Sequence, residues 1–127
     1  MAAFNFKARF ADLVEQGVKP STIRAMRKRL PKPGELLHLF TGMRTKSCRK
    51  LMLVPCLDVQ MIVIMSAALR LGPRWLLYEQ RHLIARMDGF KDFQELRDWF
   101  RETHGLPFKG FWTLWDPAKA IRKKEDG

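Results

Sequence analysis

The longest apolar stretch of the chain, residues 51–69, limits the folds that are open to it. It is interrupted by Pro55, Asp58, Gln60 and Ser66. A membrane-spanning helix needs about 20 consecutive apolar residues, so these interruptions argue against one here. Between residues 57 and 65 apolar side chains first alternate with polar ones and then occupy both faces, which predicts a strand that starts half exposed and ends buried. Residues 51–54 are expected to form a second strand that pairs with it.

The other patterns predict both helices and strands. Asn5 is expected to cap a helix that ends at Gly17. Its apolar positions share one face and are Phe6, Phe10, Leu13 and Val14. Another helix is expected to begin at Asp92, with Glu95 at the capping-box position, and to end at Gly105. Further strands are expected at residues 36–40, 75–78 and 111–115, and a short helix at residues 81–87.

The charge balance points to an anionic partner. The chain has 24 Lys and Arg against 13 Asp and Glu, a net charge of +11, and a pI near 10.3. Such an excess attracts polyanions through electrostatic steering and counterion release. RNA or a nucleotide is therefore the expected partner and DNA the second choice, whereas a membrane is not expected. The sequence leaves the oligomeric state open.

The length of 127 residues suits one domain. Residues 1–117 are expected to form this domain, and residues 118–127 a charged C-terminal tail. The first residues lack the basic-then-apolar order of a secretory signal, so the cytoplasm is the expected compartment. Cys48 and Cys56 would be reduced there, and their spacing does not indicate a metal site. No metal or other cofactor is expected.

The segment from Lys19 to Arg24 is the strongest candidate for a binding site. It reads Lys-Pro-Ser-Thr-Ile-Arg and places an amine, two hydroxyl groups and a guanidinium within six residues. Such groups bind phosphate or nucleotide oxygens. The candidate phosphate ligands here and in the following basic run are Ser21, Arg24, Arg27, Lys28 and Arg29. Arg44, Lys46 and Arg49 in the next polar connection are added to this set, and Trp112 is kept as a platform on which a base could stack.

Five features in order resemble the ASCH domain family, a PUA-like group of small β-barrels associated with RNA. They are the segment 17–24, the turn 32–35, the connection 44–48, Asp88-Gly89-Phe90 with its following helix, and the strand that ends at Trp115. The resemblance covers roughly residues 4–116. It implies an α+β fold, a mixed β-barrel of about five to six strands with two or three flanking helices. It also implies a cleft lined by the Lys-x-x-Thr-x-Arg segment and an acidic residue.

Family members are described as RNA-binding modules, and some small ones hydrolyse the acetyl amide of acetylcytidine with a lysine, a threonine and a glutamate. Lys19 and Thr22 match the first two positions. The glutamate is not matched: Asp88 lies nearest to its place, and Glu79 lies nine residues earlier. Because a carboxylate shortened by one methylene sits roughly an ångström further back, and such misplacement can cost about a hundredfold in rate, the resemblance does not fix the activity.

The residues themselves suggest a chemistry for such a site. Burial of Lys19 beside Arg24 would lower the pKa of its amine and let it act as a general base toward Thr22 or a water. Asp88 or Glu79 would carry the proton onward, and Arg24 would hold a phosphate or stabilise an oxyanion. The sequence thus predicts an RNA- or nucleotide-binding protein. Three functions remain open: a ribonuclease, an acetylcytidine amidohydrolase, and a module that binds without catalysis.

A DNA-binding helix-turn-helix is the alternative fold for the N-terminal third. In that interpretation residues 8–16 form the first helix and Ser21 caps a recognition helix over residues 22–30. Arg24, Arg27 and Lys28 would then reach DNA. The second helix would have few apolar side chains to bury, and the strands expected at residues 51–65 also argue against it.

Overall fold

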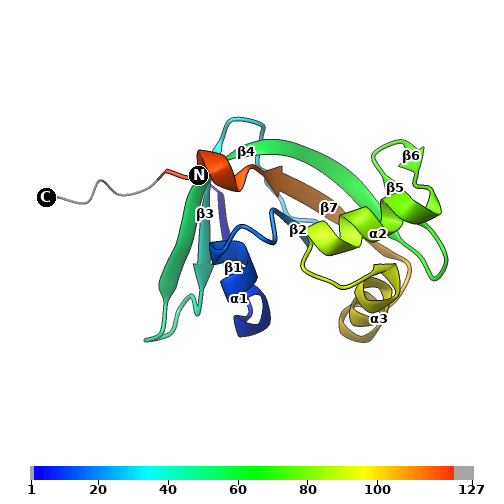
Figure 1. Cartoon of the computed structure of the whole chain (residues 1–127), viewed down its shortest axis with the longest axis horizontal. Helices are drawn as coiled ribbons and strands as arrows, with labels where there is room; N and C mark the ends of the chain where they lie inside the picture. The colour runs from blue at the N-terminus through cyan, green and yellow to red at the C-terminus, as the bar shows by residue number, and fades with distance from the viewer. Residues whose placement is uncertain (1, 122–127) are drawn as a thin grey trace, which may run out of the picture.

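Strand β4 (Arg49–Ile64) is the longest element and runs through both halves of the sheet (Figure 1). The chain is represented by a computed structural model that describes residues 2–121. The other strands are β1 (Ala2–Phe6), β2 (Ser21–Ala25), β3 (Leu36–Thr41), β5 (Leu69–Leu71), β6 (Arg74–Trp75) and β7 (Phe108–Trp115). The helices are α1 (Ala8–Glu15), α2 (Tyr78–Met87) and α3 (Phe93–Thr103), followed by the short 3₁₀ turn η1 (Pro117–Lys119). The expected α+β class is confirmed.

The expectation that residues 51–54 and 57–65 form two strands paired with each other is wrong. They belong to one strand, whose first half pairs with β3 and whose second half pairs with β7 and β5. The change of partner falls at Pro55, which lies opposite Leu36 of β3, and Cys56, which lies opposite Trp115 of β7. Proline has no N–H to donate to a ladder, so it is tolerated where one pairing ends and another begins.

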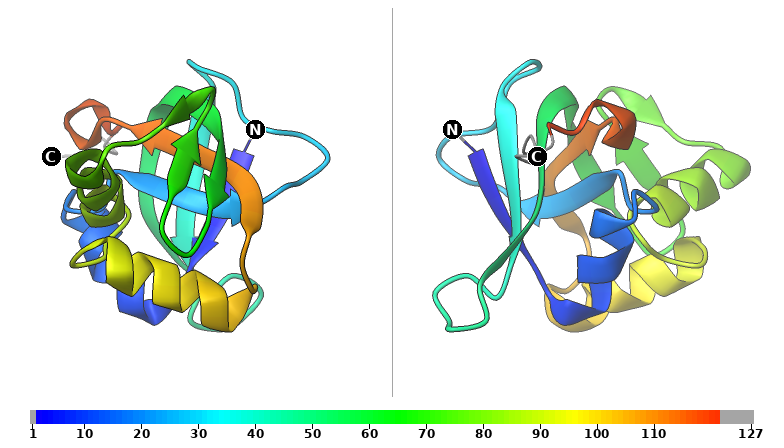
Figure 2. Two further views of the ribbon diagram at one scale, coloured as in Figure 1. Left: turned by 90° about the vertical axis from the view of Figure 1, so that its right-hand side faces the viewer. Right: turned by 60° about the vertical axis from the view of Figure 1, so that its left-hand side comes forward.

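The sheet has the curvature of a barrel but is not closed (Figure 2). Strand β1 pairs in parallel with β3, and β2 pairs antiparallel with β7. Within the described residues β1 and β2 each pair with one strand only, and they form the two sides of an open seam. The mixed, barrel-like architecture expected from the resemblance is therefore confirmed, but among the described residues the sheet has seven strands rather than five to six, and it is open at this seam.

Residues 2–6 form a strand, so the expectation that Asn5 caps the first helix is wrong. Ala2, Phe4 and Phe6 are buried in alternation with Ala3 and Asn5, which is the period of a strand. Phe6 fits both the strand and the helix pattern, which is why the boundary was misplaced. Helix α1 begins at Ala8, and the side-chain Oδ1 of Asn5 accepts a hydrogen bond from the N–H of Met43 at 2.9 Å.

The helix-turn-helix alternative is overturned because β2 occupies the start of its recognition helix. Ser21 lies opposite Leu114 and Ala25 opposite Gly110 in the antiparallel ladder with β7. Gly110 permits this close approach, since a Cβ at that position would lie 2.1 Å from the carbonyl oxygen of Arg24. The strand expected at residues 75–78 is also wrong in extent: β6 covers only Arg74–Trp75, and Tyr78 begins α2.

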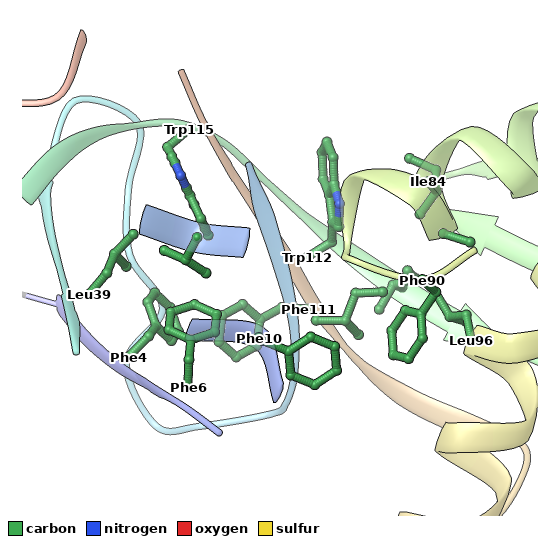
Figure 3. Close-up of a cluster of buried hydrophobic side chains, with 14 of the residues drawn as sticks. Phe4, Phe6, Phe10, Leu39, Ile84, Phe90, Leu96, Phe111, Trp112 and Trp115 are labelled. Atoms are coloured by element: carbon green, nitrogen blue, oxygen red, sulfur yellow. The ribbon is translucent and has the colours of Figure 1, made fainter. Parts of the chain in front are cut away.

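The helix expected after Asp92 is confirmed. The Oδ1 of Asp92 accepts a hydrogen bond from the N–H of Glu95 at 2.9 Å, and α3 buries Phe93, Leu96 and Phe100. Helices α2 and α3 cover one side of the sheet, and the core continues from them into the barrel (Figure 3). Its barrel part includes Phe4, Phe6, Leu39, Phe111 and Trp115.

The structure describes the beginning of the expected C-terminal tail. Of the expected C-terminal tail, residues 118–121 are described: η1 includes Ala118, and the N–H of Ile121 donates to the carbonyl oxygen of Leu53 at 2.7 Å. Residues 122–127, the rest of that tail, lie outside the described residues.

No helix within residues 2–121 is long and apolar enough to cross a membrane.

Candidate nucleotide-binding cleft

A cavity of about 460 Å³ lies where β1, α1, β2 and α3 meet. This is within the usual size of small-molecule sites, about 300–1,000 Å³. Its polar lining comes mainly from Asn5, Lys19, Thr22, Arg24, Arg27 and Asp88. Its aromatic lining consists of Phe6, Phe10, Phe90, Trp99, Phe100 and His104. The cavity thus combines apolar rings with a few convergent polar groups.

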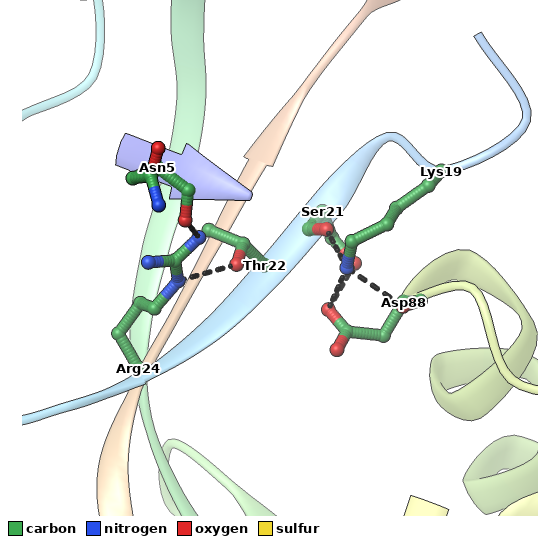
Figure 4. Close-up of polar contacts among 6 residues, drawn as sticks. All are labelled: Asn5, Lys19, Ser21, Thr22, Arg24 and Asp88. Carbon is green, nitrogen blue, oxygen red and sulfur yellow. Dashed lines mark hydrogen bonds and ion pairs between the residues drawn. The ribbon is translucent and has the colours of Figure 1, made fainter. Parts of the chain in front are cut away.

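Lys19 is buried, with 2% of its surface exposed. Helix α1 ends at Glu15, and Gly17, with a φ of +80°, reverses the chain just after it. The N–H of Lys19 donates to the carbonyl oxygen of Leu13 at 3.0 Å. The Lys19 amine then meets three acceptors: the carbonyl oxygen of Ser21 at 2.8 Å, and the carbonyl oxygen and Oδ1 of Asp88 at 2.6 and 3.2 Å (Figure 4). An ammonium group has three protons, so these acceptors match it fully.

Burial is the largest influence on the pKa values of Lys19 and Asp88. It lowers the pKa of Lys19 to about 8, although the Asp88 carboxylate acts in the opposite direction. Burial also raises the pKa of Asp88 above its usual range, against the effect of Lys19 and a hydrogen bond from the Ser21 hydroxyl at 3.2 Å. Both shifts favour the neutral forms, as expected for ionisable groups removed from water.

Gly89 permits the approach of Asp88 to Lys19. Its φ is +92°, in the left-handed region that favours glycine. A Cβ at this position would lie 3.1 Å from the Cδ of Lys19 and 3.2 Å from the Cδ1 of Phe10. The Asp-Gly-Phe segment therefore brings a carboxyl group and an aromatic ring to the cavity through a turn that a larger residue would disturb.

Thr22 and Arg24 lie on the same face of β2, two residues apart. The Nε of Arg24 donates to the hydroxyl oxygen of Thr22 at 2.9 Å, and its Nη2 donates to the carbonyl oxygen of Asn5 at 2.8 Å (Figure 4). Its Nη1 has no partner among the described residues. Burial lowers the pKa of Arg24 to about 10, so the group remains a cation at neutral pH. The guanidinium is thus held rigidly while some of its N–H groups stay available to a ligand.

Arg24 and Arg27 together bridge the open seam. Arg27 Nη1 donates to the carbonyl oxygen of Ala3 at 3.3 Å, as Arg24 does to that of Asn5. The guanidinium carbon of Arg27 lies 4.6 Å from the ring centre of Phe4, and that of Arg24 lies 4.8 Å from the ring centre of Phe6. Cation–π contacts of this kind add to the hydrogen bonds. Side chains therefore make the connection between β1 and β2 that the backbone does not make.

The structure brings together five of the expected site residues and separates the others. Lys19, Thr22, Arg24 and Asp88 all line the cavity, together with Arg27. Ser21 is fully buried and bonds to Asp88, but it does not line the cavity. Glu79 lies exposed in the first turn of α2 and does not line the cavity either. Of the two candidate carboxylates, Asp88 is therefore the one in the cleft.

The choice of Trp112 as a stacking platform is not supported, because Trp112 is only 4% exposed. Trp99 lines the cavity instead. Trp99 was not among the expected site residues, and it is half-buried at the edge of the apolar face of α3. Asn5 and His104 were also missed as lining residues. The sequence signal that could have identified Trp99 as a lining residue is its position at the margin of the apolar face of an amphipathic helix, close to the Asp-Gly-Phe turn.

The remaining expected phosphate ligands lie outside the cavity lining, on two loops and at the start of β4. Lys28 and Arg29 are exposed on the loop between β2 and β3, and Arg29 Nη2 lies 3.1 Å from Oε2 of Glu35. Arg44 and Lys46 are exposed in the connection between β3 and β4. Arg49 forms an ion pair with Glu15 of α1 at 2.5 Å. Within residues 2–121 no group of three or more His, Cys, Asp or Glu side chains is placed to hold a metal ion.

Comparisons with known proteins bear on the fold. Neither a protein-family model nor a curated protein matches the chain. Among solved structures, the chain is similar to the crystal structure of a mutant of ZmASCH, an ASCH protein, from Zymomonas mobilis. The TM-score is 0.54 at 17% sequence identity, and the likeness covers 94% of this chain and 71% of that chain. The fold is therefore of the ASCH type, as the ordered motifs predicted.

Proposed function

We propose that the cavity binds a nucleotide, either free or as part of an RNA strand. The observation that carries this proposal is that a rigidly held guanidinium, a hydroxyl group and several aromatic rings line one cavity of about 460 Å³. A base can stack on aromatic side chains such as Trp99, and a phosphate can bind the N–H groups of Arg24. The net charge of +11 would attract the polyanion to the site.

Arg24 is the expected phosphate ligand because its position is fixed before a ligand arrives. Hydrogen bonds to Thr22 and Asn5 and contacts with Phe4 and Phe6 hold the guanidinium in place. A preorganised side chain loses little rotamer freedom on binding, which favours affinity. Arg27 at the same seam supplies a second positive charge beside the first.

The test is a binding titration followed by tryptophan fluorescence, because Trp99 lines the cavity. Nucleoside monophosphates and short RNA oligonucleotides would be titrated into the wild-type protein and into Arg24→Met. A hydrogen bond to a charged group contributes about 1.5–3 kcal/mol, so binding should weaken by roughly tenfold or more in the variant. Arg86→Met is the control, since Arg86 is exposed on α2 and carries the same charge.

A second variant separates loss of the ligand contact from damage to the seam. Thr103 lies exposed at the end of α3 and lines the cavity, so Thr103→Phe should obstruct the cavity without removing a seam contact. Both Arg24→Met and Thr103→Phe should weaken binding, while Arg86→Met should not. Equal affinities in all three variants, or no saturable binding by the wild type, would refute the proposal.

Hydrolysis of RNA or of an acylated nucleoside such as acetylcytidine is the second candidate function. It is favoured by the lowered pKa of Lys19, about 8, and by the presence of Thr22 in the lining of the same cavity. The neutral amine would take a proton from Thr22 or from water, and Asp88 would return a proton to the leaving group. Product release from acetylcytidine and from labelled RNA would be measured for the wild type and for Thr22→Val. Activity that survives in Thr22→Val would exclude Thr22 as the nucleophile.

A further inference from the structure

One face of the sheet is exposed beyond the barrel. A single row of neighbouring residues crosses four strands there: Lys109 of β7, Val63 of β4, Arg70 of β5 and Trp75 of β6. Side chains alternate between the two faces of a strand, so Met61 and Met65 lie on the same face as Val63. We call these six residues the exposed sheet face. Helices α2 and α3 cover the opposite face (Figure 2, left), where Ile62, Ile64 and Leu69 are fully or almost fully buried.

The exposed sheet face combines large apolar side chains with cations. Trp75 is 56% exposed, Met61 45% and Met65 38%. The guanidinium carbon of Arg70 lies 5.7 Å from the ring centre of Trp75, and Lys109 is exposed at the other end of the row. None of the six residues is acidic. Neighbouring exposed apolar side chains that are bordered by polar residues are typical of an interaction surface.

The exposed side chain of Arg27 lies between this face and the cleft, whose lining it joins. The next row runs from Met61 of β4 through Phe111 of β7 to Arg24 of β2. Phe111 is fully buried in this row, and Arg24 lines the cavity. Arg27 extends over this row, with its guanidinium carbon 5.5 Å from the ring centre of Phe111. From β2 to β6 there are four strand spacings of about 4.8 Å, so a path from the cleft over Arg27 to Trp75 spans roughly 20 Å.

We propose that the exposed sheet face binds a single strand of nucleic acid that continues from the cleft. This inference rests on the proposed function of the cavity. Aromatic rings on which bases stack, flanked by cations that follow the backbone, are the features by which proteins bind single strands without reading their sequence. At about 3.4 Å per stacked nucleotide, a 20 Å path accommodates on the order of six nucleotides. The two cations and the absence of acidic side chains favour a polyanion over a second copy of this basic protein.

The experiment compares nucleoside monophosphates with oligonucleotides of two to ten nucleotides, measured for the wild type and Trp75→Ala. Affinity should rise with length up to about six nucleotides. Trp75→Ala should weaken the longer oligonucleotides about fivefold or more but leave monophosphate binding unchanged. Trp75→Phe, which keeps an aromatic ring, should retain most of the affinity. Leu83→Ala is the control, because Leu83 is 54% exposed on α2, which covers the opposite face.

Two further measurements identify the occupant. Arg70→Met should reduce by about one the slope of log affinity against log salt for the longer oligonucleotides. Light scattering of the wild type and Trp75→Ala would show whether the face instead joins two copies of this chain. A change of oligomeric state in Trp75→Ala without a change in oligonucleotide affinity would overturn the inference.

The outcomes separate this inference from the proposed function. If monophosphates bind in an Arg24-dependent way but longer oligonucleotides bind no more tightly, the sheet face is not used and the cavity proposal stands. If oligonucleotide binding depends on Trp75 but is the same in Arg24→Met, the sheet face binds the strand and the cavity proposal fails. Dependence on both residues supports both proposals, and no binding of any ligand refutes both.

Discussion

Replacing Asp88 with asparagine tests whether Lys19 is held as a buried cation. Asparagine has the same shape as aspartate, and its amide oxygen can still accept a hydrogen bond from the Lys19 amine. The two carbonyl acceptors at 2.8 and 2.6 Å also remain. The substitution therefore removes one negative charge at 3.2 Å from the amine and little else.

The expected cost follows from that distance and from burial. Breaking a buried ion pair typically costs 3–5 kcal/mol, because the remaining charge is left uncompensated in a poorly hydrated site. Since three acceptors for Lys19 are retained, we expect the lower end, about 3 kcal/mol at pH 7. The pKa of Lys19 is lowered to about 8 even though Asp88 raises it. Without that carboxylate the pKa must fall further.

The dependence on pH has a definite sign. In the wild type the folded pKa of Lys19, about 8, lies below its ordinary value of 10.5. The folded state therefore loses this proton first, and the contribution of Lys19 to stability rises with pH between these two values. In Asp88→Asn the amine is neutral from a lower pH. The stability difference between the variant and the wild type should thus be largest below the variant's folded pKa, shrink as the pH rises from there to about 8, and stay level above it.

Urea unfolding of both proteins at several pH values between about 6 and 9.5, followed by tryptophan fluorescence, measures this difference. Asp98→Asn is the matched control. Asp98 pairs with Arg97 and Arg101 on the surface, with 51% of its side chain exposed, so its loss should cost less than about 1 kcal/mol. A cost for Asp88→Asn as small as that of Asp98→Asn, or one that stays constant across the pH range, would refute the account of the buried pair.

Two predictions concern the sheet and the thiols. Gly110→Ala should destabilise the protein by about 3 kcal/mol or more, because its Cβ would meet the Arg24 carbonyl oxygen at 2.1 Å. Gly34→Ala, with open space around it, should cost about 1–2 kcal/mol. Equal losses of stability in the two variants, measured by thermal unfolding, would contradict this. A thiol reagent at pH 8 should modify exposed Cys48 rapidly, but Cys56 only on unfolding, since burial raises the pKa of Cys56 to about 11. Reaction of both thiols at one rate in the folded protein would be the contrary result.

The motifs predicted the type of fold better than they predicted the course of the strands. Local signals with a single interpretation were reliable. Asp92 and Glu95 mark the start of α3, and Gly17 lies just after the end of α1. Pro55 was misleading because it was interpreted as a break, whereas it lies where β4 changes partners. Such a change depends on the position of distant strands, and no pattern within residues 49–64 reveals it.

The candidate site was predicted in part for the same reason. Lys19, Thr22 and Arg24 lie close together in the sequence, and the resemblance supplied Asp88, which is distant from them. The difference between Trp112 and Trp99 could not be seen locally, because both lie in apolar patterns. Trp112 is buried between the sheet and the helices, as Figure 3 shows, whereas Trp99 borders a cavity that exists only once α1, β2 and α3 have come together.

The seam between β1 and β2 also affects how the protein behaves when it is concentrated. An outer strand with unpaired carbonyl groups is a template on which a strand of another molecule can add. On β1 the carbonyl oxygens of Ala3 and Asn5 are already occupied by Arg27 and Arg24. Two positive charges stand where an incoming strand would have to lie. These arginines therefore disfavour the addition of a strand from another molecule to β1, and so disfavour aggregation, whether or not a ligand is bound.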